Sequence, residues 1–519
     1  MQGKRGCAST TISINGVVPV TPQSPAIRAY SGASTSAQTA AEFSTATDSD
    51  HSWKEDEMKQ RLHTQSTIMR RCVARYLIVV VCLVVLTPAT SKAANVTTNV
   101  DYNNPRQTIE GFGASATWVA NDLDAFSPAK QTQILDLLYS TSQAGAGLSW
   151  VRVGSFLCNF NPSPGVFDWN YWGIQSGMRW LQRVNAGYGV NKYVVSSWSP
   201  PAWMKDNNSC INGGHVRSQF YPDLAALKIQ WLNNAKTQLG FEAQVESVQN
   251  EPNMRTTYDS CEWTTTEMST FVANHLRPAL VSSGLTARIM APEVSFYSNF
   301  DNAWGFPLLN DPGMRAATSI MATHGYGRTD KFETPCNSCT QYNKPIWQTE
   351  DSNLDGRYNG SIDDGLTWST EINKALNGGR FSAWFYWWVM TLNNDNQGLI
   401  NANPSTDSFQ VPKRLYVMGQ FSRFIRPGSV LLPSTSSDAT LQVTAVKPAN
   451  GNVAVVLANT GKTSHTVTVN LNGLVNMPAT VTPYRTSATE NQAQLSAINV
   501  FSGAFTITIP AKSVVTVVG

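Results

Sequence analysis

The stretch VESVQNEPN, residues 245–253, places a carboxylate where an extended segment stops. The run from Val245 to Asn250 has the two-residue alternation that is typical of a β-strand. Pro252 cannot donate a hydrogen bond to a strand ladder and favours an extended backbone at Glu251. Glu251 is therefore expected at the C-terminal end of a strand. Taken alone, it could equally be a solvated surface residue, so the rest of the chain must decide.

Other strand-like runs end in residues that could do chemistry. Eight such runs alternate with helical segments over residues 107–427, which predicts a (β/α)₈ barrel of the TIM type. The C-terminal ends of the strands meet at one face of such a barrel. The polar and aromatic residues expected there, including Trp118 after the first strand, are Trp118, Arg152, Trp198, Asn250, Glu251, Glu293, His324, Tyr326, Glu350, Trp387 and Trp388.

Glu251 and Glu350 end the fourth and seventh predicted strands and would face each other across one pocket. Hydrolysis of a glycosidic bond needs two such carboxyls, about 5–5.5 Å apart when the anomeric configuration is retained. Their mutual repulsion separates their pKa values and leaves one as the acid. We expect Arg152 to keep Glu350 ionised and Asn250 to bind the sugar hydroxyl next to the reacting carbon. Glu293 competes for a catalytic role, but we assign it to binding sugar or orienting a neighbour.

Helix signals separate most of the predicted strands. Ser127-Pro128 can open one helix, and a second runs from Pro222 to Leu239 and stops at Gly240. Thr264 and Glu267 have the spacing of a capping box for a third. These signals support the barrel, because its strands must be joined by helices.

The sequence pattern changes after Pro427-Gly428. Alternating runs around Asn450-Gly451 predict a hairpin, and similar runs continue to the C-terminus. We therefore predict a β-sandwich over residues 428–519, with residues 95–106 as an additional strand from the other end of the chain.

The first residues differ from the remainder. Residues 1–68 are rich in Ser, Thr and Ala, which indicates either a disordered leader or an over-extended start. Residues 69–94 have the layout of a signal peptide that begins at Met69, with arginines before a short apolar run. We therefore expect a secreted protein without stable membrane association; a membrane anchor with a cytoplasmic tail is the alternative. Three N-glycosylation sequons fit secretion and begin at Asn95, Asn207 and Asn359.

Composition and motifs exclude several classes of protein. A formal charge of +3 is too small to suggest nucleic-acid binding. The sequence GFGASA, 111–116, loosely fits a dinucleotide fingerprint, but no long helix follows it, and no metal motif occurs, so no cofactor or metal is expected. We expect a monomer whose partner is its polysaccharide substrate.

Five cysteines follow the leader, so at least one is unpaired: Cys158, Cys210, Cys261, Cys336 and Cys339. The pairing stays open, and the last two form either a loop disulfide or unrelated thiols.

The motifs GFGASATW, WVRVGS, SSWSPPAWMK, SVQNEPN, SCEWT, WQTED, YWWV and YVMGQFSRFIRPG resemble glycoside hydrolase family 30 over residues 95–519. The resemblance implies that Glu251 is the acid/base and Glu350 the nucleophile of a secreted retaining endo-β-glycanase. Xylan is the first expected substrate, with β-1,6-galactan or β-1,6-glucan as alternatives. A glucosylceramidase or a non-catalytic carbohydrate-binding protein is the weaker alternative.

The family's glucuronoxylan-specific branch carries an arginine just after the tryptophan pair of the eighth strand. Thr391 and Leu392 stand in that place here, and no lysine or arginine follows until Lys413. The enzyme is therefore predicted not to depend on glucuronate side groups.

Overall fold

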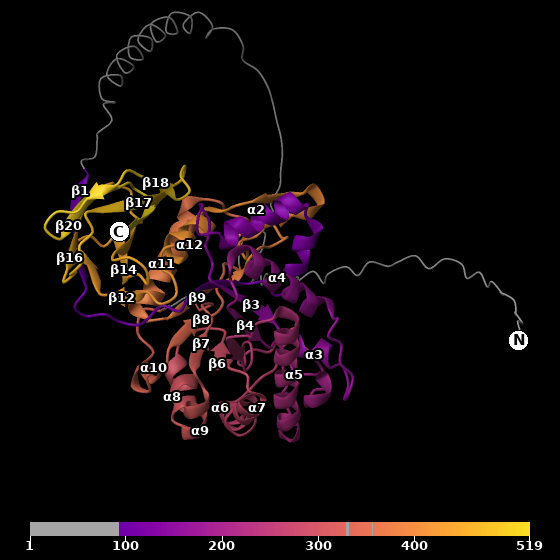
Figure 1. Cartoon of the computed structure of the whole chain (residues 1–519). Helices are drawn as coiled ribbons and strands as arrows, with labels where there is room; N and C mark the ends of the chain where they lie inside the picture. Colours follow the sequence, from indigo (N-terminus) through magenta and orange to yellow (C-terminus); the bar gives the residue numbers. More distant parts are fainter. Residues whose placement is uncertain (1–92, 328–331, 355) are drawn as a thin grey trace, which may run out of the picture. The chain divides into compact units, whose positions relative to one another are not determined.

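The computed structural model describes residues 93–327, 332–354 and 356–519 (Figure 1). The predicted leader and almost all of the predicted signal peptide lie outside these residues. Within the described ranges, no helix is both long and apolar enough to cross a membrane.

Eight parallel strands close into a barrel in chain order, which confirms the predicted fold class. Most of their residues are buried, as expected for strands covered on both faces. Apolar side chains from the first halves of the strands fill the end of the barrel at which the strands begin. They form one cluster that includes Trp150, Trp347 and Phe385. The strands are β2 (Gly111–Ser115), β3 (Trp150–Gly154), β4 (Tyr193–Ser196), β5 (Val245–Ser247), β6 (Arg288–Val294), β7 (Ile320–Thr323), β8 (Ile346–Gln348) and β9 (Ala383–Trp388).

Helices connect the barrel strands and surround them (Figure 1). The helix predicted from Pro222 spans Tyr221–Leu239 (α5) and stops at Gly240, whose positive φ of 80° suits glycine. The predicted capping box of Thr264 and Glu267 is formed at the start of α6. The principal barrel helices are α2 (Pro128–Tyr139), α4 (Trp172–Tyr188), α5, α6 (Thr265–Phe271), α7 (Arg277–Ser283), α8 (Phe306–Leu309), α9 (Pro312–Ala317), α10 (Asn337–Gln341), α11 (Ile362–Asn373) and α12 (Lys413–Ser422).

The C-terminal residues form two sheets that share an apolar core. One sheet has the order β13-β1-β16-β20, and the other has β12-β14-β15-β21-β17-β18 with β19 beside β17. The strands are β1 (Ala94–Asp101), β12 (Val430–Leu432), β13 (Ser434–Ser436), β14 (Leu441–Lys447), β15 (Ala454–Asn459), β16 (His465–Asn472), β17 (Thr480–Thr486), β18 (Ala493–Gln494), β19 (Ile498–Asn499), β20 (Ala504–Ile509) and β21 (Ser513–Val518).

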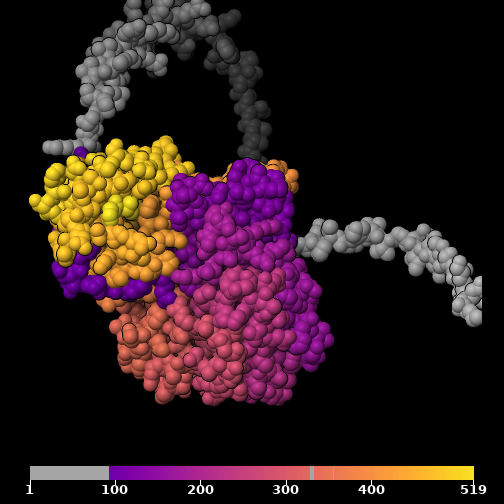
Figure 2. Space-filling view, in the orientation of Figure 1, coloured from indigo at the N-terminus to yellow at the C-terminus, as the bar shows by residue number. Residues whose placement is uncertain are grey.

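The first described strand belongs to this sandwich rather than to the barrel. β1 pairs in parallel with β16 and antiparallel with β13. Figure 2 shows this indigo segment against the yellow strands from the C-terminus. The chain therefore first contributes β1 to the sandwich, then forms the barrel, and finally forms the remaining strands of the sandwich.

Helices α11 and α12 lie between the barrel and the sandwich (Figure 1). Thr516 Oγ1 donates to the carbonyl of Gln420 at 2.6 Å, and the Gln420 side chain donates to Thr486 Oγ1 at 2.8 Å. Buried hydrogen bonds of this kind fix the two domains in one compact unit.

Candidate active site

The predicted site residues meet at the C-terminal end of the barrel. Each is carried by a strand or by the residues directly after one, so the closed sheet fixes their backbone positions. Arg152 lies on β3 and Glu293 on β6, whereas Glu251 and Glu350 follow β5 and β8. The two glutamates are thus presented by the fourth and seventh strands of the barrel.

Arg152 contacts three of the predicted site residues. Its Nη1 contacts Glu350 Oε2 at 2.7 Å, its Nε contacts Glu293 Oε1 at 3.0 Å, and its Nη2 donates to Asn250 Oδ1 at 2.5 Å. The arginine side chain is fully buried. A planar guanidinium can hold several acceptors in fixed directions, which lysine cannot do.

Glu251 and Glu350 each accept two hydrogen bonds. Tyr326 donates to Glu350 Oε1 at 2.8 Å, opposite the oxygen that Arg152 contacts. Glu251 is contacted by His324 Nδ1 at 3.1 Å and by the Tyr258 hydroxyl at 3.2 Å. One ligand atom each of Glu251, His324 and Glu350 lies within 4.8 Å of the other two. This spacing is smaller than the separation of about 6.5–9.5 Å between two carboxyl groups that leaves room for an attacking water.

Charge and burial act in opposite directions on Glu350. Burial raises its pKa and Glu251 raises it further, whereas His324 and Arg152 lower it; the net direction is upward. The sequence-based expectation considered only the arginine and omitted the cost of burial. Arg152 and Tyr326 nevertheless both donate to Glu350, and such bonds favour its ionised form.

His324 is a buried cation at neutral pH. Burial lowers its pKa, but Glu350, Glu251 and Glu293 raise it to about 9. Its other nitrogen, Nε2, lies 3.8 Å from Glu293 Oε1. The imidazolium therefore stands between the catalytic candidates and a third carboxylate.

Glu293 does not reach the pocket as a sugar-binding residue would. It lies within β6 and is fully buried, and its oxygens accept from Arg152, Ser196 and Ser247. Burial raises its pKa, but Arg152 and His324 lower it to about 2. Of the two roles predicted for Glu293, this geometry favours orienting its neighbours.

Two of the glutamates have unusual backbone conformations. Glu251 has φ 46° and Glu293 has φ 66°, values that side-chain-bearing residues rarely adopt. Local strain of this kind persists where the surrounding structure enforces it, and it is concentrated at functional sites.

Tryptophan rings pack against one another beside Arg152. Its guanidinium lies 4.6 Å from the centre of the Trp198 ring, and Trp118 packs on Trp198 at 4.9 Å. Trp387 stacks on Trp388 at 4.9 Å. Trp198, Trp387 and Trp388 are only 5%, 7% and 7% exposed, so little of each residue is open to a ligand. Trp118 is half-buried and the more accessible of the four.

Sequence reasoning missed three polar partners of the site: Tyr258, Ser196 and Ser247. Tyr258 lies in the loop that follows Glu251, and a hydroxyl-bearing aromatic so close after a catalytic candidate was an available signal. The two serines point inward from β4 and β5 to Glu293. Small hydroxyl residues are common in strands, so their role was not visible from the sequence.

The cysteine pairing is resolved by the structure. Cys158 is bonded to Cys210 and Cys336 to Cys339, and Cys261 is free and buried. The first disulfide joins the segment that follows β3 to the segment that follows β4. The CxxC is therefore a loop disulfide, which is one of the two alternatives left open above.

The group formed by Glu251, His324 and Glu350 is close enough to hold a metal ion within the described part of the chain. However, His324 Nδ1 is engaged with Glu251, and Glu350 with Arg152 and Tyr326. Metal-free catalysis stays a prediction.

The barrel and the carboxylate pair define a glycoside hydrolase. Residues 109–423 match the model of glycosyl hydrolase family 59, and residues 428–517 match the β-sandwich domain of glycosyl hydrolase family 30. The chain therefore belongs to these glycosyl hydrolases, and its relatives and structural neighbours place it with family 30 as the sequence motifs predicted.

Relatives with named activities cover most of the chain. Glucuronoxylanase XynC of Bacillus subtilis (strain 168) is 26% identical over 82% of this chain and 92% of that protein. An endo-1,6-β-D-glucanase of Neurospora crassa is 22% identical over 72% of this chain and 83% of that protein.

Solved structures share the architecture. The catalytic domain of xylanase C of family 30 from Talaromyces cellulolyticus has a TM-score of 0.71 and 26% identity, covering 81% of this chain and 99% of that chain. The family 30 xylanase Xyn30A of Clostridium acetobutylicum has a TM-score of 0.67 and 28% identity, covering 82% and 99%.

Proposed function

We propose that this glycosidase is a retaining endo-β-glycanase that hydrolyses xylan. Glu350 attacks the anomeric carbon, and Glu251 gives its proton to the departing glycosidic oxygen. The observation that carries this proposal is the close approach of Glu251, His324 and Glu350, within 4.8 Å of one another. That spacing favours direct attack by one carboxylate over attack by an interposed water.

The reaction then has two displacements. In the first, the C–O bond to the leaving group breaks, a bond to a Glu350 oxygen forms, and the Glu251 proton moves to the leaving oxygen. In the second, Glu251 takes a proton from water, and the resulting hydroxide displaces Glu350 with the β configuration restored.

Charge moves between the two carboxyls during the first step. Glu350 loses its negative charge as the covalent bond forms, while Glu251 gains one as its proton leaves. His324 contacts Glu251 and is also 3.8 Å from Glu350 Oε1, so its cation can stabilise either charge. Asn250, held by Arg152, is positioned to bind a neighbouring sugar hydroxyl.

Xylan is favoured because relatives named as xylanases match in both sequence and structure, at identities of 26–28%. A β-1,6-glucan is the second candidate, supported by the endo-1,6-β-D-glucanase of Neurospora crassa. A β-1,6-galactan remains the third alternative from the sequence. Initial rates and products on purified polymers of the three kinds test the choice, and activity on none of them would refute the proposal.

The mechanism has its own test, independent of the polymer. Proton NMR of the first product should show the β anomer before mutarotation. An α anomer as the first product would exclude the double displacement.

We also propose that the enzyme does not need glucuronate side groups. Thr391 and Leu392 follow the tryptophan pair of β9, and Leu392 is exposed. Neither can replace a cation that binds a carboxylate. Matched xylans with and without glucuronic acid should be cut at similar initial rates. A tenfold loss without it, about 1.4 kcal/mol of transition-state binding, would contradict this part of the proposal.

Secretion, domain limits and monomeric state are further proposals. The mature chain should begin near Ala94 or Asn95, ahead of a barrel over 107–427 and a sandwich over 428–519. N-terminal sequencing of material from the culture medium tests the first point, and light scattering tests the monomer. A chain retained in the membrane from Met1 would overturn the assignment of a signal peptide.

A further inference from the structure

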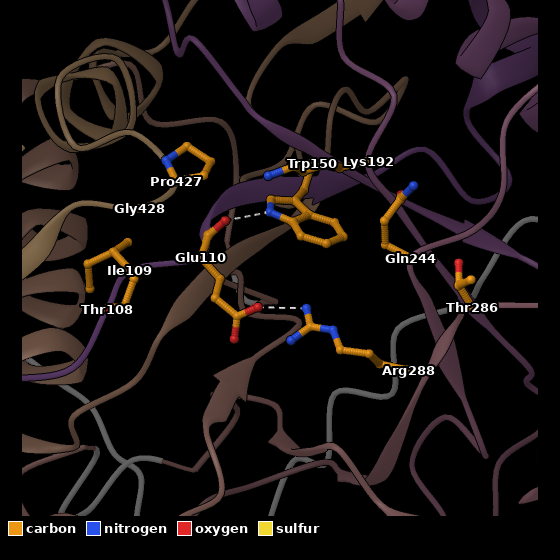
Figure 3. Close-up of a pocket in the computed structure, with 10 residues that line it drawn as sticks. All are labelled: Thr108, Ile109, Glu110, Trp150, Lys192, Gln244, Thr286, Arg288, Pro427 and Gly428. Carbon is orange, nitrogen blue, oxygen red and sulfur yellow. Dashed lines mark hydrogen bonds and ion pairs between the residues drawn. The ribbon is translucent and has the colours of Figure 1, made fainter. Parts of the chain in front are cut away.

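A second pocket lies at the end of the barrel where the strands begin, opposite the catalytic carboxyls. Figure 3 shows the residues that line it. The pocket is open to solvent and has a volume of about 530 Å³. Its polar side chains stand where strands begin: Glu110 precedes β2, Lys192 precedes β4, and Arg288 is the first residue of β6. The chain also passes between barrel and sandwich here, at Thr108 and at Pro427-Gly428.

Glu110 is held in place by three contacts. Arg288 Nη2 contacts its Oε2 at 2.6 Å, Trp347 Nε1 donates to its Oε1 at 3.0 Å, and Trp150 Nε1 donates to its carbonyl at 2.7 Å. Figure 3 shows the bonds to Arg288 and Trp150 across the pocket. The carboxylate is thus fixed at the pocket, and each oxygen can accept a further hydrogen bond.

Lys192 has no comparable partner. Its ammonium lies 5.7 Å from the centre of the Trp150 ring, and among the described residues it forms neither a hydrogen bond nor an ion pair. Burial lowers its pKa, Glu110 raises it, and Arg288 and Arg426 lower it again; the net direction is downward. Two cations, Lys192 and Arg288, therefore line the pocket beside one carboxylate, and Lys192 has no ion-pair partner among the described residues.

We propose that this pocket binds a sugar acid, with the uronate carboxylate on Lys192 and Arg288. A carboxylate would supply the missing counterion through charge-assisted hydrogen bonds. Glu110 selects the rest of the ligand, because it can accept from sugar hydroxyls but would repel a second negative charge. The hydroxyls of Thr108 and Thr286 also line the pocket. A ligand with one carboxylate and several hydroxyls fits this set better than phosphate, which offers more charge and few donors.

The site is separate from the catalytic face, so its test does not depend on which polysaccharide is cleaved. Binding of D-glucuronate, D-glucose and inorganic phosphate to the whole chain is measured by ligand-observed NMR at pH 7. Glucuronate should bind at least tenfold more tightly than glucose or phosphate. Lys192→Gln should weaken glucuronate binding at least tenfold. Lys462→Gln, which removes an exposed lysine from the turn between β15 and β16, should leave binding as in the wild type.

Three outcomes would overturn the proposal. Absence of glucuronate binding would do so directly. Equal binding of phosphate would show that any oxyanion suffices and that the hydroxyls contribute nothing. Unchanged glucuronate binding in Lys192→Gln would place the bound sugar elsewhere on the protein. Melting temperatures of both variants, expected to match the wild type, separate lost binding from lost folding.

Discussion

The two ends of the barrel each carry a short arginine–glutamate pair, and they differ in burial. At the C-terminal end, Arg152 contacts Glu350 at 2.7 Å with both side chains nearly inaccessible. At the N-terminal end, Arg288 contacts Glu110 at 2.6 Å, with side chains 36% and 22% exposed. The distances are alike, so distance alone does not identify a catalytic site.

What distinguishes the catalytic end is the concentration of charge on buried side chains. Three glutamates, an arginine and a histidine share one buried network, and His324 and Glu293 have pKa values displaced to about 9 and about 2. Strongly displaced values in a buried cluster are characteristic of catalytic sites. At the other end, water screens the pair and one lysine stays without a counterion. The buried end is thus suited to chemistry, and the wetter end to binding a charged ligand.

The largest expected effect comes from Glu350→Gln. No covalent glycosyl-enzyme can form, so turnover of polymer should fall on the order of 10⁴-fold or more. Initial rates on the best polymer measure this. Glu490→Gln, in the half-buried pair with Arg485 on the sandwich, serves as the matched control and should keep wild-type rates. Near-wild-type turnover in Glu350→Gln would remove it as the nucleophile.

Glu251→Ala should separate proton donation from attack. Polymer hydrolysis should fall strongly, while aryl glycosides with good leaving groups should be affected least in the first step, because they need no proton. Burst kinetics on such substrates checks this, since the glycosyl-enzyme should accumulate. Equal losses on both kinds of substrate would contradict the assignment of Glu251 as the acid.

Arg152→Lys is expected to cost about a hundredfold in kcat, because three contacts lose their fixed directions. Loss of the fixed guanidinium contact also leaves burial less opposed at Glu350, so the pKa of that carboxyl, which is already raised, should rise further. The acid limb of kcat/KM should then move to higher pH. The corresponding change at the other end, Arg288→Lys, should leave the position of this limb unchanged. A shift of the same size in both variants would show that the two ends do not differ as proposed.

Tyr258→Phe should have a smaller effect, about tenfold or less in kcat. It removes one hydrogen bond to Glu251 from a side chain that is 39% exposed, and such a bond contributes about 1 kcal/mol. Two kinds of substrate distinguish this role from loop packing: loss of the bond should slow polymer, which needs the proton of Glu251, more than aryl glycosides with good leaving groups. Equal losses on both kinds of substrate would assign Tyr258 to packing alone.

The pH dependence of stability should also reveal the buried network. The pKa of His324 rises from 6.5 to about 9 on folding, so its contribution is complete below about 6.5 and is lost as pH rises through about 9. Glu293 has the opposite sign: its pKa is about 2, so its contribution is complete above about 4.5 and is lost as pH falls through about 2. Urea unfolding from pH 6 to pH 9 should show falling stability that is absent in His324→Gln. A flat wild-type profile would mean that His324 is neutral.

The sequence determined the barrel and the location of the carboxylate pair. Strand periodicity, Pro252 after Glu251 and helix caps at Thr264 and Gly240 are local signals, and the residues that produce them are adjacent in the chain. The order of eight strand–helix repeats then restricts the strand ends to one face. Glu251 and Glu350 could therefore be assigned to one pocket before any contact was known.

Only the tertiary structure decided how charge is distributed within that pocket. Glu293 belongs to the same strand-end pattern as the other two glutamates, yet it points into the barrel and accepts from Arg152, Ser196 and Ser247. The direction of the pKa shift at Glu350 likewise depends on burial, which is a sum over residues distant in the chain. The pocket around Lys192 exists because five strand beginnings and the link to the sandwich converge. Electrostatic energies depend on distance and on the exclusion of water, and neither can be read from residue order.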